Sequence, residues 1–195
     1  MKNNYIVKRV VSFMFDFLVV NVLTGLFVVS TSAPYANQIS EFFINMGTSP
    51  EDFTEFEVLV NKYFIASAND AMFILVVFIF YYVILAKLLG GKTLGCMLTG
   101  LKIVKTNGTK LTYSDLTVKM LFTNLGIQYI MMCIIFIPLN SYIIIASMIF
   151  SIVSILYYIF LVVNFIFLST KGTSIVDRMS KTRPLIIMKS SRDSV

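Results

Sequence analysis

The most constraining feature of the sequence is a set of apolar blocks that are long enough to cross a lipid bilayer. About 20 apolar residues span the ~30 Å hydrocarbon layer, and the first two blocks have that length. The third block, about residues 117–168, is roughly twice too long for one crossing, and Pro138 and Asn140 interrupt it where a turn is needed. The pattern predicts four transmembrane helices, at about residues 10–30, 71–89, 117–137 and 142–168.

The distribution of charge gives these helices an orientation. Only 13% of the residues are charged, as expected for a chain whose solvent is lipid. Fifteen of the sixteen Lys and Arg residues lie in the two terminal segments and in the loop between helices two and three. The positive-inside rule places these three parts in the cytoplasm. We therefore expect an all-α membrane protein with both termini inside, whose basic residues reflect sorted loops and do not form a nucleic-acid surface.

The first apolar block has an alternative interpretation as a cleaved signal peptide, with Ala33 as the last residue removed. Against cleavage, Pro34 would follow the cut, the apolar run is too long, and Asp16 interrupts it. We therefore expect a retained helix, and we treat residues 1–195 as a single membrane domain.

Residues 32–69 form an extracytoplasmic insertion between the first two predicted helices. Spaced apolar residues in 51–65 predict an amphipathic helix, and Ser49 followed by Pro50 is a typical helix start. The insertion is thus expected to be partly helical. The alternative is a solvated loop that lies on the membrane surface.

The loop between helices two and three carries the signature of a short cytoplasmic β-hairpin. Residues 101–105 and 109–113 flank Asn107-Gly108, the residue pair that suits a two-residue hairpin turn. Ser114-Asp115 then resembles a cap that opens the third membrane helix.

The residue inventory argues against catalysis, metal binding and a cofactor. The chain has no His, which excludes His-type zinc sites and Ser–His or Cys–His nucleophilic pairs. Cys96 and Cys133 are isolated from each other in the sequence. Gly91-Lys92-Thr93 fails as a phosphate loop, because Ala86 stands where that motif needs Gly. The spacing of Gly91 and Gly95 favours a tight turn with close backbone approach over a dimerisation motif.

Asp16 is the most costly residue of the predicted membrane helices. A carboxylate within the bilayer costs roughly 2.5–3.5 kcal/mol on insertion scales, and it usually faces a polar interior. One interpretation is an ion or proton site, and the other is a packing anchor. The candidate partners at a similar depth are Lys87, Asn124 and Asn164.

Arg9 and Asp177 lie at the same predicted membrane face. Arg9 is two helical turns from Asp16, too far for an ion pair between adjacent turns. Asp177 follows the last helix and could form a clasp with Arg9 that joins the two ends of the chain. The alternative for Arg9 is a snorkelling residue at the membrane surface.

These residues resemble the signature of the RDD family, which is named for one arginine and two aspartates: here Arg9, Asp16 and Asp177. Residues 90–108 resemble the family's glycine-punctuated loop, and residues 173–182 resemble its C-terminal signature. The family commonly has a basic residue at the position of Cys96 and His at the position of Val176. Residues 31–70 look like an insertion.

The resemblance implies a protein of the bacterial inner membrane, with two classes of function open. In the first, the protein is a transporter coupled to a cation or proton through Asp16. Four helices are few for alternating access, so this reading implies a homodimer. In the second, it is a non-transporting membrane partner, regulator or immunity-type subunit, which acts through its outer segment or its hairpin.

Overall fold

The computed structural model describes residues 2–27, 30–45, 50–123, 126–138 and 142–187, and every structural statement below concerns these residues. The chain is mostly helical and divides into two compact units. Unit 1 comprises residues 1–23, 77–125 and 160–195, and unit 2 comprises residues 24–76 and 126–159.

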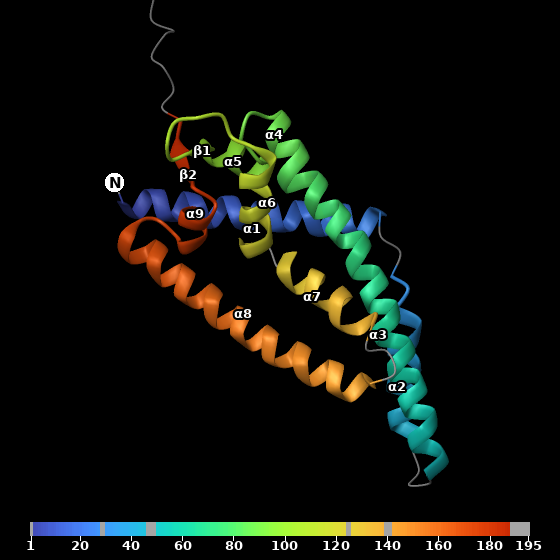
Figure 1. Cartoon of the computed structure of the whole chain (residues 1–195). Coiled ribbons are helices and arrows are strands. Elements are labelled where there is room, and N and C mark those ends of the chain that lie inside the picture. The colour runs from blue at the N-terminus through green and yellow to red at the C-terminus, as the bar shows by residue number, and fades with distance from the viewer. Residues whose placement is uncertain (1, 28–29, 46–49, 124–125, 139–141, 188–195) are drawn as a thin grey trace, which may run out of the picture. The chain divides into compact units, whose positions relative to one another are not determined.

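Unit 2 is built around small side chains where its helices approach each other. Its helices are α2 (Ala33–Asn45), most of α3 (Pro50–Ile79), α7 (Gly126–Phe136) and the first part of α8 (Ile143–Lys171) (Figure 1). Ala68 and Ala146 are fully buried, which allows the helices close contact. Phe136 fills the remaining space and stacks on Phe64 with 4.4 Å between the ring centroids.

Asp70, on α3, holds the segment that leads into α2. Its carboxylate accepts hydrogen bonds from the backbone N–H groups of Thr31 and Ser32 and from the hydroxyl groups of Ser30, Thr31 and Ser32. Five donors on one carboxylate offset the cost of burying it. The predicted partly helical insertion is confirmed as helical in α2 and α3, whereas Ser49 lies outside the described residues.

Unit 1 contains the first part of helix α1 (Lys2–Phe27), the two strands and a series of short elements (Figure 1). A π-helical segment, η1, follows α3 without a break. In chain order the shorter elements are η1 (Phe80–Leu85), α4 (Ala86–Leu88), α5 (Leu94–Thr99), β1 (Leu101–Lys105), α6 (Tyr113–Thr123), α9 (Ile175–Met179) and β2 (Thr182–Ile186).

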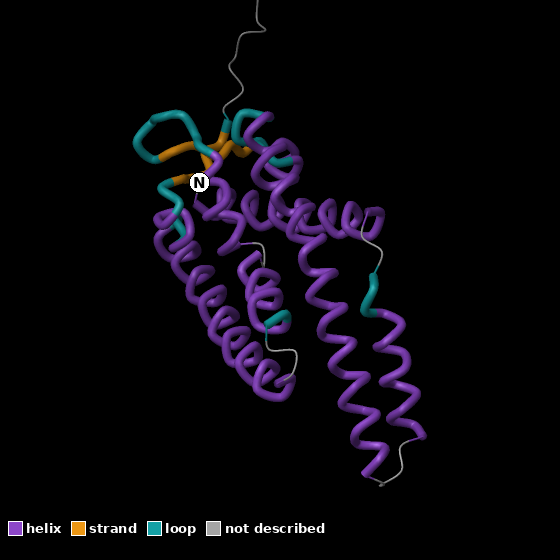
Figure 2. The backbone as a smooth tube through the Cα atoms, turned by 45° about the vertical axis from the view of Figure 1, so that its right-hand side comes forward, coloured by secondary structure: helices purple, strands orange, loops and turns teal. Residues whose placement is uncertain are grey.

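The predicted hairpin is wrong in its second strand. β1 pairs antiparallel with β2, with Leu101 opposite Ile186 and Lys105 opposite Thr182. Figure 2 shows the two strands together near the N-terminal end of α1, where the Tyr5 hydroxyl donates to Pro184 O at 3.0 Å. Pro184 lies opposite Ile103 in this pair and has no N–H to donate. The Ile103 N–H points away from β2 and donates to Gly91 O at 2.7 Å. Proline is therefore tolerated at this edge position.

A turn does form here, but it lies one residue earlier than predicted, with Thr106 and Asn107 at its centre, and it leads into a helix. Gly108 has φ +75° and its N–H donates to Lys105 O. Thr112 and Asp115 then cap α6 reciprocally, each side chain accepting from the other residue's backbone N–H. The cap begins at Thr112, two residues before the predicted Ser114. Residues 109–113 therefore lead into α6 and do not form the predicted second strand.

Among the described residues, two helices are long and apolar enough to cross a membrane, Phe53–Leu88 and Ile144–Lys171. The α6–α7 pair adds a third span if the pair is counted as one broken crossing. The predicted helix 142–168 is confirmed as α8, and the predicted helix 71–89 is the second half of a longer one. The predicted helix 117–137 is two helices, with Gly126, a poor helix former, at the start of the second. Residues 10–30 belong mostly to α1, which is not among the candidate spans.

Candidate functional site

Asp16 is buried in unit 1 and accepts three hydrogen bonds from other elements. The Tyr81 hydroxyl donates to Oδ1 at 2.6 Å, and the Gly95 N–H donates to the same oxygen at 2.8 Å. The Thr93 hydroxyl donates to Oδ2 at 2.6 Å. Hydroxyl contacts this short are typical of a charged carboxylate acceptor.

Local structure presents all three donors. Tyr81 lies in η1, and π-helical turns are often found at functional sites. Thr93 is the N-cap of α5, where its hydroxyl also accepts from Cys96 N at 3.2 Å. Gly95 lies in the first turn of α5, whose N–H groups have no partner within the helix.

Gly95 must be glycine because α1 passes directly over it. A Cβ at this position would lie 2.2 Å from Ser12 O and 2.8 Å from Asp16 Cγ. The close backbone approach predicted for Gly91 and Gly95 is therefore confirmed at Gly95. It also applies at Gly91, where a Cβ would lie 2.4 Å from Ile103 O.

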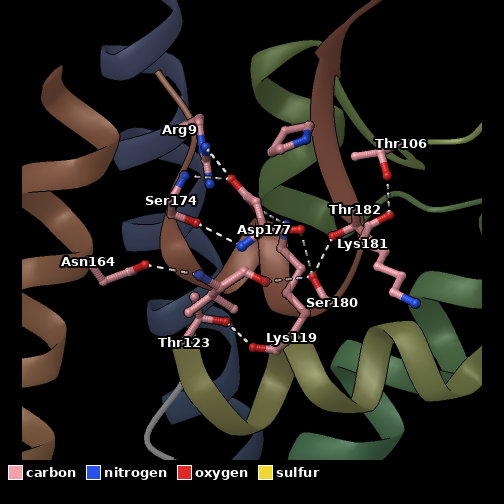
Figure 3. Close-up of polar contacts among 12 residues, drawn as sticks. Arg9, Thr106, Lys119, Thr123, Asn164, Ser174, Asp177, Ser180, Lys181 and Thr182 are labelled. Carbon is pink, nitrogen blue, oxygen red and sulfur yellow. Dashed lines mark hydrogen bonds and ion pairs between the residues drawn. The ribbon is translucent and has the colours of Figure 1, made fainter. Parts of the chain in front are cut away.

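A second carboxylate, Asp177, is the centre of an ion-pair cluster (Figure 3). Lys119 Nζ lies 2.8 Å from its Oδ1, and Arg9 Nη1 lies 2.7 Å from its Oδ2. The Ser174 N–H donates to Oδ2 at 3.2 Å, which completes a capping box at the start of α9. Of the two interpretations of Arg9, the clasp with Asp177 is the one present as an ion pair, and Lys119 is a third member that the sequence analysis did not identify.

The cluster sets the charge of Asp177. Burial by itself would raise the pKa of this carboxyl, but the Lys119 ammonium and the Arg9 guanidinium lower the pKa to about 2. Asp177 is therefore ionised at neutral pH. The Arg9 contact is electrostatic rather than directional, because Nη1 makes no hydrogen bond of suitable geometry to a described residue.

Hydrogen bonds continue from this cluster into α8 and β2 (Figure 3). Asn164 Oδ1 on α8 accepts from the Val176 N–H at 3.1 Å, next to Asp177. The hydroxyl groups of Ser180 and Thr182 lie 2.8 Å apart at the start of β2. Through Arg9 on α1, Lys119 on α6 and these hydrogen bonds, the cluster joins α1 and α6 to the C-terminal segment.

A cavity of about 110 Å³ lies between the two carboxylate sites. Asp16, Ser12 and Thr93 line it together with Arg9 and Lys119. Its volume is enough for a few water molecules, each of which needs about 10–15 Å³ of such space and two or more polar partners. The arrangement can hold water or a small ion between one carboxylate and two cationic side chains.

The other predicted partners of Asp16 lie elsewhere. Lys87 Nζ donates to Leu111 O and lies 5.6 Å from the centre of the Tyr113 ring. Asn164 serves the Asp177 cluster, as described above, and Asn124 lies outside the described residues. Within the described ranges, no three His, Cys, Asp or Glu side chains are grouped for metal binding.

The sequence analysis missed two hydrogen-bond donors to Asp16, Tyr81 and Thr93, and one ion-pair partner of Asp177, Lys119. Thr93 carried a usable signal, because a Thr before a short apolar segment is a helix cap whose side chain faces inward. Tyr81 and Lys119 carried none, since their roles depend on how separate helices pack.

Comparison with known proteins identifies one family. The family model described as the RDD family matches residues 5–181. No curated protein and no solved structure matches the chain. The matched range includes both carboxylate sites, β1 and every lining residue of the cavity between them except Pro184.

Proposed function

The chain belongs to the RDD family, and from that premise we propose that it is a bacterial inner-membrane protein of transport type in which Asp16 takes up a proton or cation. Both chain termini lie in the cytoplasm in this proposal. The observation that carries it is the cavity that Asp16 lines together with Arg9 and Lys119. A buried carboxylate beside a space for water is the arrangement that proton relays in membranes use.

The ligand set favours a proton over a metal cation. A carboxylate has about four acceptor positions, and three of those on Asp16 are already used. The other side-chain oxygens in the cavity lining are neutral hydroxyl groups, those of Ser12, Tyr82, Thr93 and Thr123. A hard cation such as Ca²⁺ takes six to eight oxygen ligands, carboxylates among them, whereas a proton needs one oxygen.

Protonation would occur most readily at Oδ2 of Asp16. Oδ1 faces a backbone donor, the Gly95 N–H, which cannot turn away. Oδ2 faces the Thr93 hydroxyl, which can rotate and accept a hydrogen bond in place of donating one. Thr93 also lines the cavity and caps α5. Uptake of a proton thus alters the contact between α1 and α5, which gives a route from protonation to movement.

Proteoliposomes with an internal pH dye test this proposal. We expect a cation gradient to drive proton flux through the wild type and through Glu57→Gln, a matched control at an exposed acid outside the cavity. Asp16→Asn should abolish the flux, and Thr93→Val should reduce it while keeping the carboxylate. Absence of flux in the wild type under any cation gradient would reject the proposal. Cross-linking in the same vesicles tests the homodimer that so small a carrier requires.

A different observation favours the alternative of a non-transporting partner protein. Two large apolar side chains, Phe43 and Ile44, are exposed on α2, which is not one of the candidate membrane spans among the described residues. Deletion of residues 36–62 separates the two functions. A transporter should keep its proton flux, whereas a partner protein should lose the proteins that co-purify with it. If the deleted and intact chains retrieve the same partners, this alternative fails.

A further inference from the structure

Unit 1 has a second cavity, of about 330 Å³, whose lining is basic. It lies between the Gly90-Gly91 turn, strand β1 and the segment that follows the Asn107-Gly108 turn. Four lysines contribute to it, Lys87, Lys102, Lys105 and Lys110, and no acidic residue does. Its volume falls within the range of small-ligand sites.

The backbone that shapes this cavity depends on Gly91. Its φ of +91° favours glycine, and its carbonyl accepts the Ile103 N–H at 2.7 Å. A Cβ on Gly91 would collide with Ile103 O and contact Leu111, which is itself part of the lining. The turn is therefore held against the edge of β1 that does not pair with β2, and the cavity is a fixed feature of this fold.

The four lysines differ in their partners. Lys105 Nζ lies 3.0 Å from Asp115 Oδ2, so that charge is balanced. Lys87 uses one N–H on Leu111 O, which carries no formal charge. Lys102 and Lys110 make no ion pair with any residue in the described ranges. Four lysines and one aspartate leave the cavity with a net charge of about +3, and such a charge in a concave site attracts anions.

The position of the cavity along the chain indicates the surroundings of its ligand. Lys87 is the second-last residue of the candidate span Phe53–Leu88. Leu88 is 72% exposed, and Met97 and Leu98 on α5 are also exposed apolar residues. A basic cavity at the end of a membrane span lies at the depth of the lipid headgroups, where each nearby Lys contributes ~1 kcal/mol of attraction to anionic lipid.

We propose that this cavity binds a phosphate group, in the form of the headgroup of an anionic phospholipid. Lys is a common phosphate ligand because its ammonium is a compact charge with three donors. Lys102 and Lys110 provide the unbalanced charge, and Lys87 provides a third ammonium at the end of the span. The site is separate from the Asp16 cavity, so a negative result in the proton-flux assay would leave this proposal unaffected.

The test measures lipid retention by native mass spectrometry of the full chain in nanodiscs. One set of discs contains neutral phosphatidylcholine alone, and a second contains phosphatidylglycerol as well. The test variant is Lys102→Gln/Lys110→Gln, and the matched control is Lys8→Gln/Lys171→Gln, which removes two basic charges elsewhere. A third arm adds inorganic phosphate to protein in neutral discs, which distinguishes a free phosphate from a lipid as the source.

We expect one bound phosphatidylglycerol, with apparent affinity lowered roughly 30-fold in the test variant and nearly unchanged in the control. If inorganic phosphate binds with the same dependence on Lys102 and Lys110, the phosphate site is supported with a soluble ligand as its source. Equal losses in both double variants, or none in either, would overturn the proposal, because the attraction would then be diffuse surface charge. Lys110→Glu, at an exposed position, also lowers the local charge by two units, so it should lower the affinity by a similar factor and covers the case in which the double variant misfolds.

Discussion

Replacement of Gly95 by alanine tests the contact on which the Asp16 site is built. The new Cβ would lie 2.2 Å from Ser12 O, so α1 and α5 must separate by about 1 Å to reach ordinary van der Waals contact. Overpacking of this kind costs roughly 1–3 kcal/mol. Loss of the Gly95 N–H bond to a charged acceptor adds roughly 1.5–3 kcal/mol. The better helix propensity of alanine offsets about 1 kcal/mol of this cost, which leaves a destabilisation of roughly 1.5–5 kcal/mol.

Cys96 provides the assay, because its thiol is buried next to Gly95. In a Cys133→Ala background, the rate at which a maleimide labels Cys96 in the native protein reports the free energy of local opening. A change of roughly 1.5–5 kcal/mol corresponds to a rate increase of roughly 10- to 5,000-fold. The matched control is Gly25→Ala. Gly25 lies on α1, the helix that passes over Gly95, and a Cβ at Gly25 would meet no atom of another element within 4 Å.

Labelling of Gly95→Ala at the same rate as the Gly25→Ala control would refute the close packing of α1 on α5. It would also remove the structural basis for Gly95 as a fixed donor to Asp16. A global loss of folding would appear instead as rapid labelling together with a lost circular dichroism signal. Thr93→Val, which removes one donor to Asp16 and adds no side-chain atom, should then show the smaller local effect.

Two further predictions concern the other buried carboxylates. Because the pKa of Asp177 is lowered to about 2 from 3.8, its stabilisation is present above pH 4 and is lost as the pH falls towards 2, an effect of roughly 2 kcal/mol. Other carboxylates titrate in both proteins, so thermal melts from pH 6 to pH 2 should show a loss of stability in Asp177→Asn that is smaller than in the wild type by about this amount. Asp70→Asn should weaken the five-donor contact at residues 30–32, so hydrogen exchange at the start of α2 should become faster, while unchanged exchange there would contradict the anchoring role.

The apolar blocks and the short local motifs could be predicted because each depends on residues close together in the chain. Helix α8, the helical insertion and a turn after residue 105 follow from hydropathy, spacing and turn chemistry. The predicted topology placed Arg9 and Asp177 at the same membrane face, and the structure shows their ion pair. It could not reveal Lys119, whose position depends on the packing of α6 beside α9.

Tertiary structure decided the pairing of strands and the partners of Asp16. The sequence alone determined that residues 101–105 would be extended, since their alternation and the following turn are local. The choice of β2 as partner was not local, because a capping box at Ser174 and a left-handed residue at Lys181 (φ 51°) return the chain from 75 residues away. In the same way the sequence determined that Asp16 needs a partner. Only the fold could supply Tyr81, Thr93 and Gly95 in place of Lys87, because a buried carboxylate is satisfied by whichever donors the packed helices bring to it.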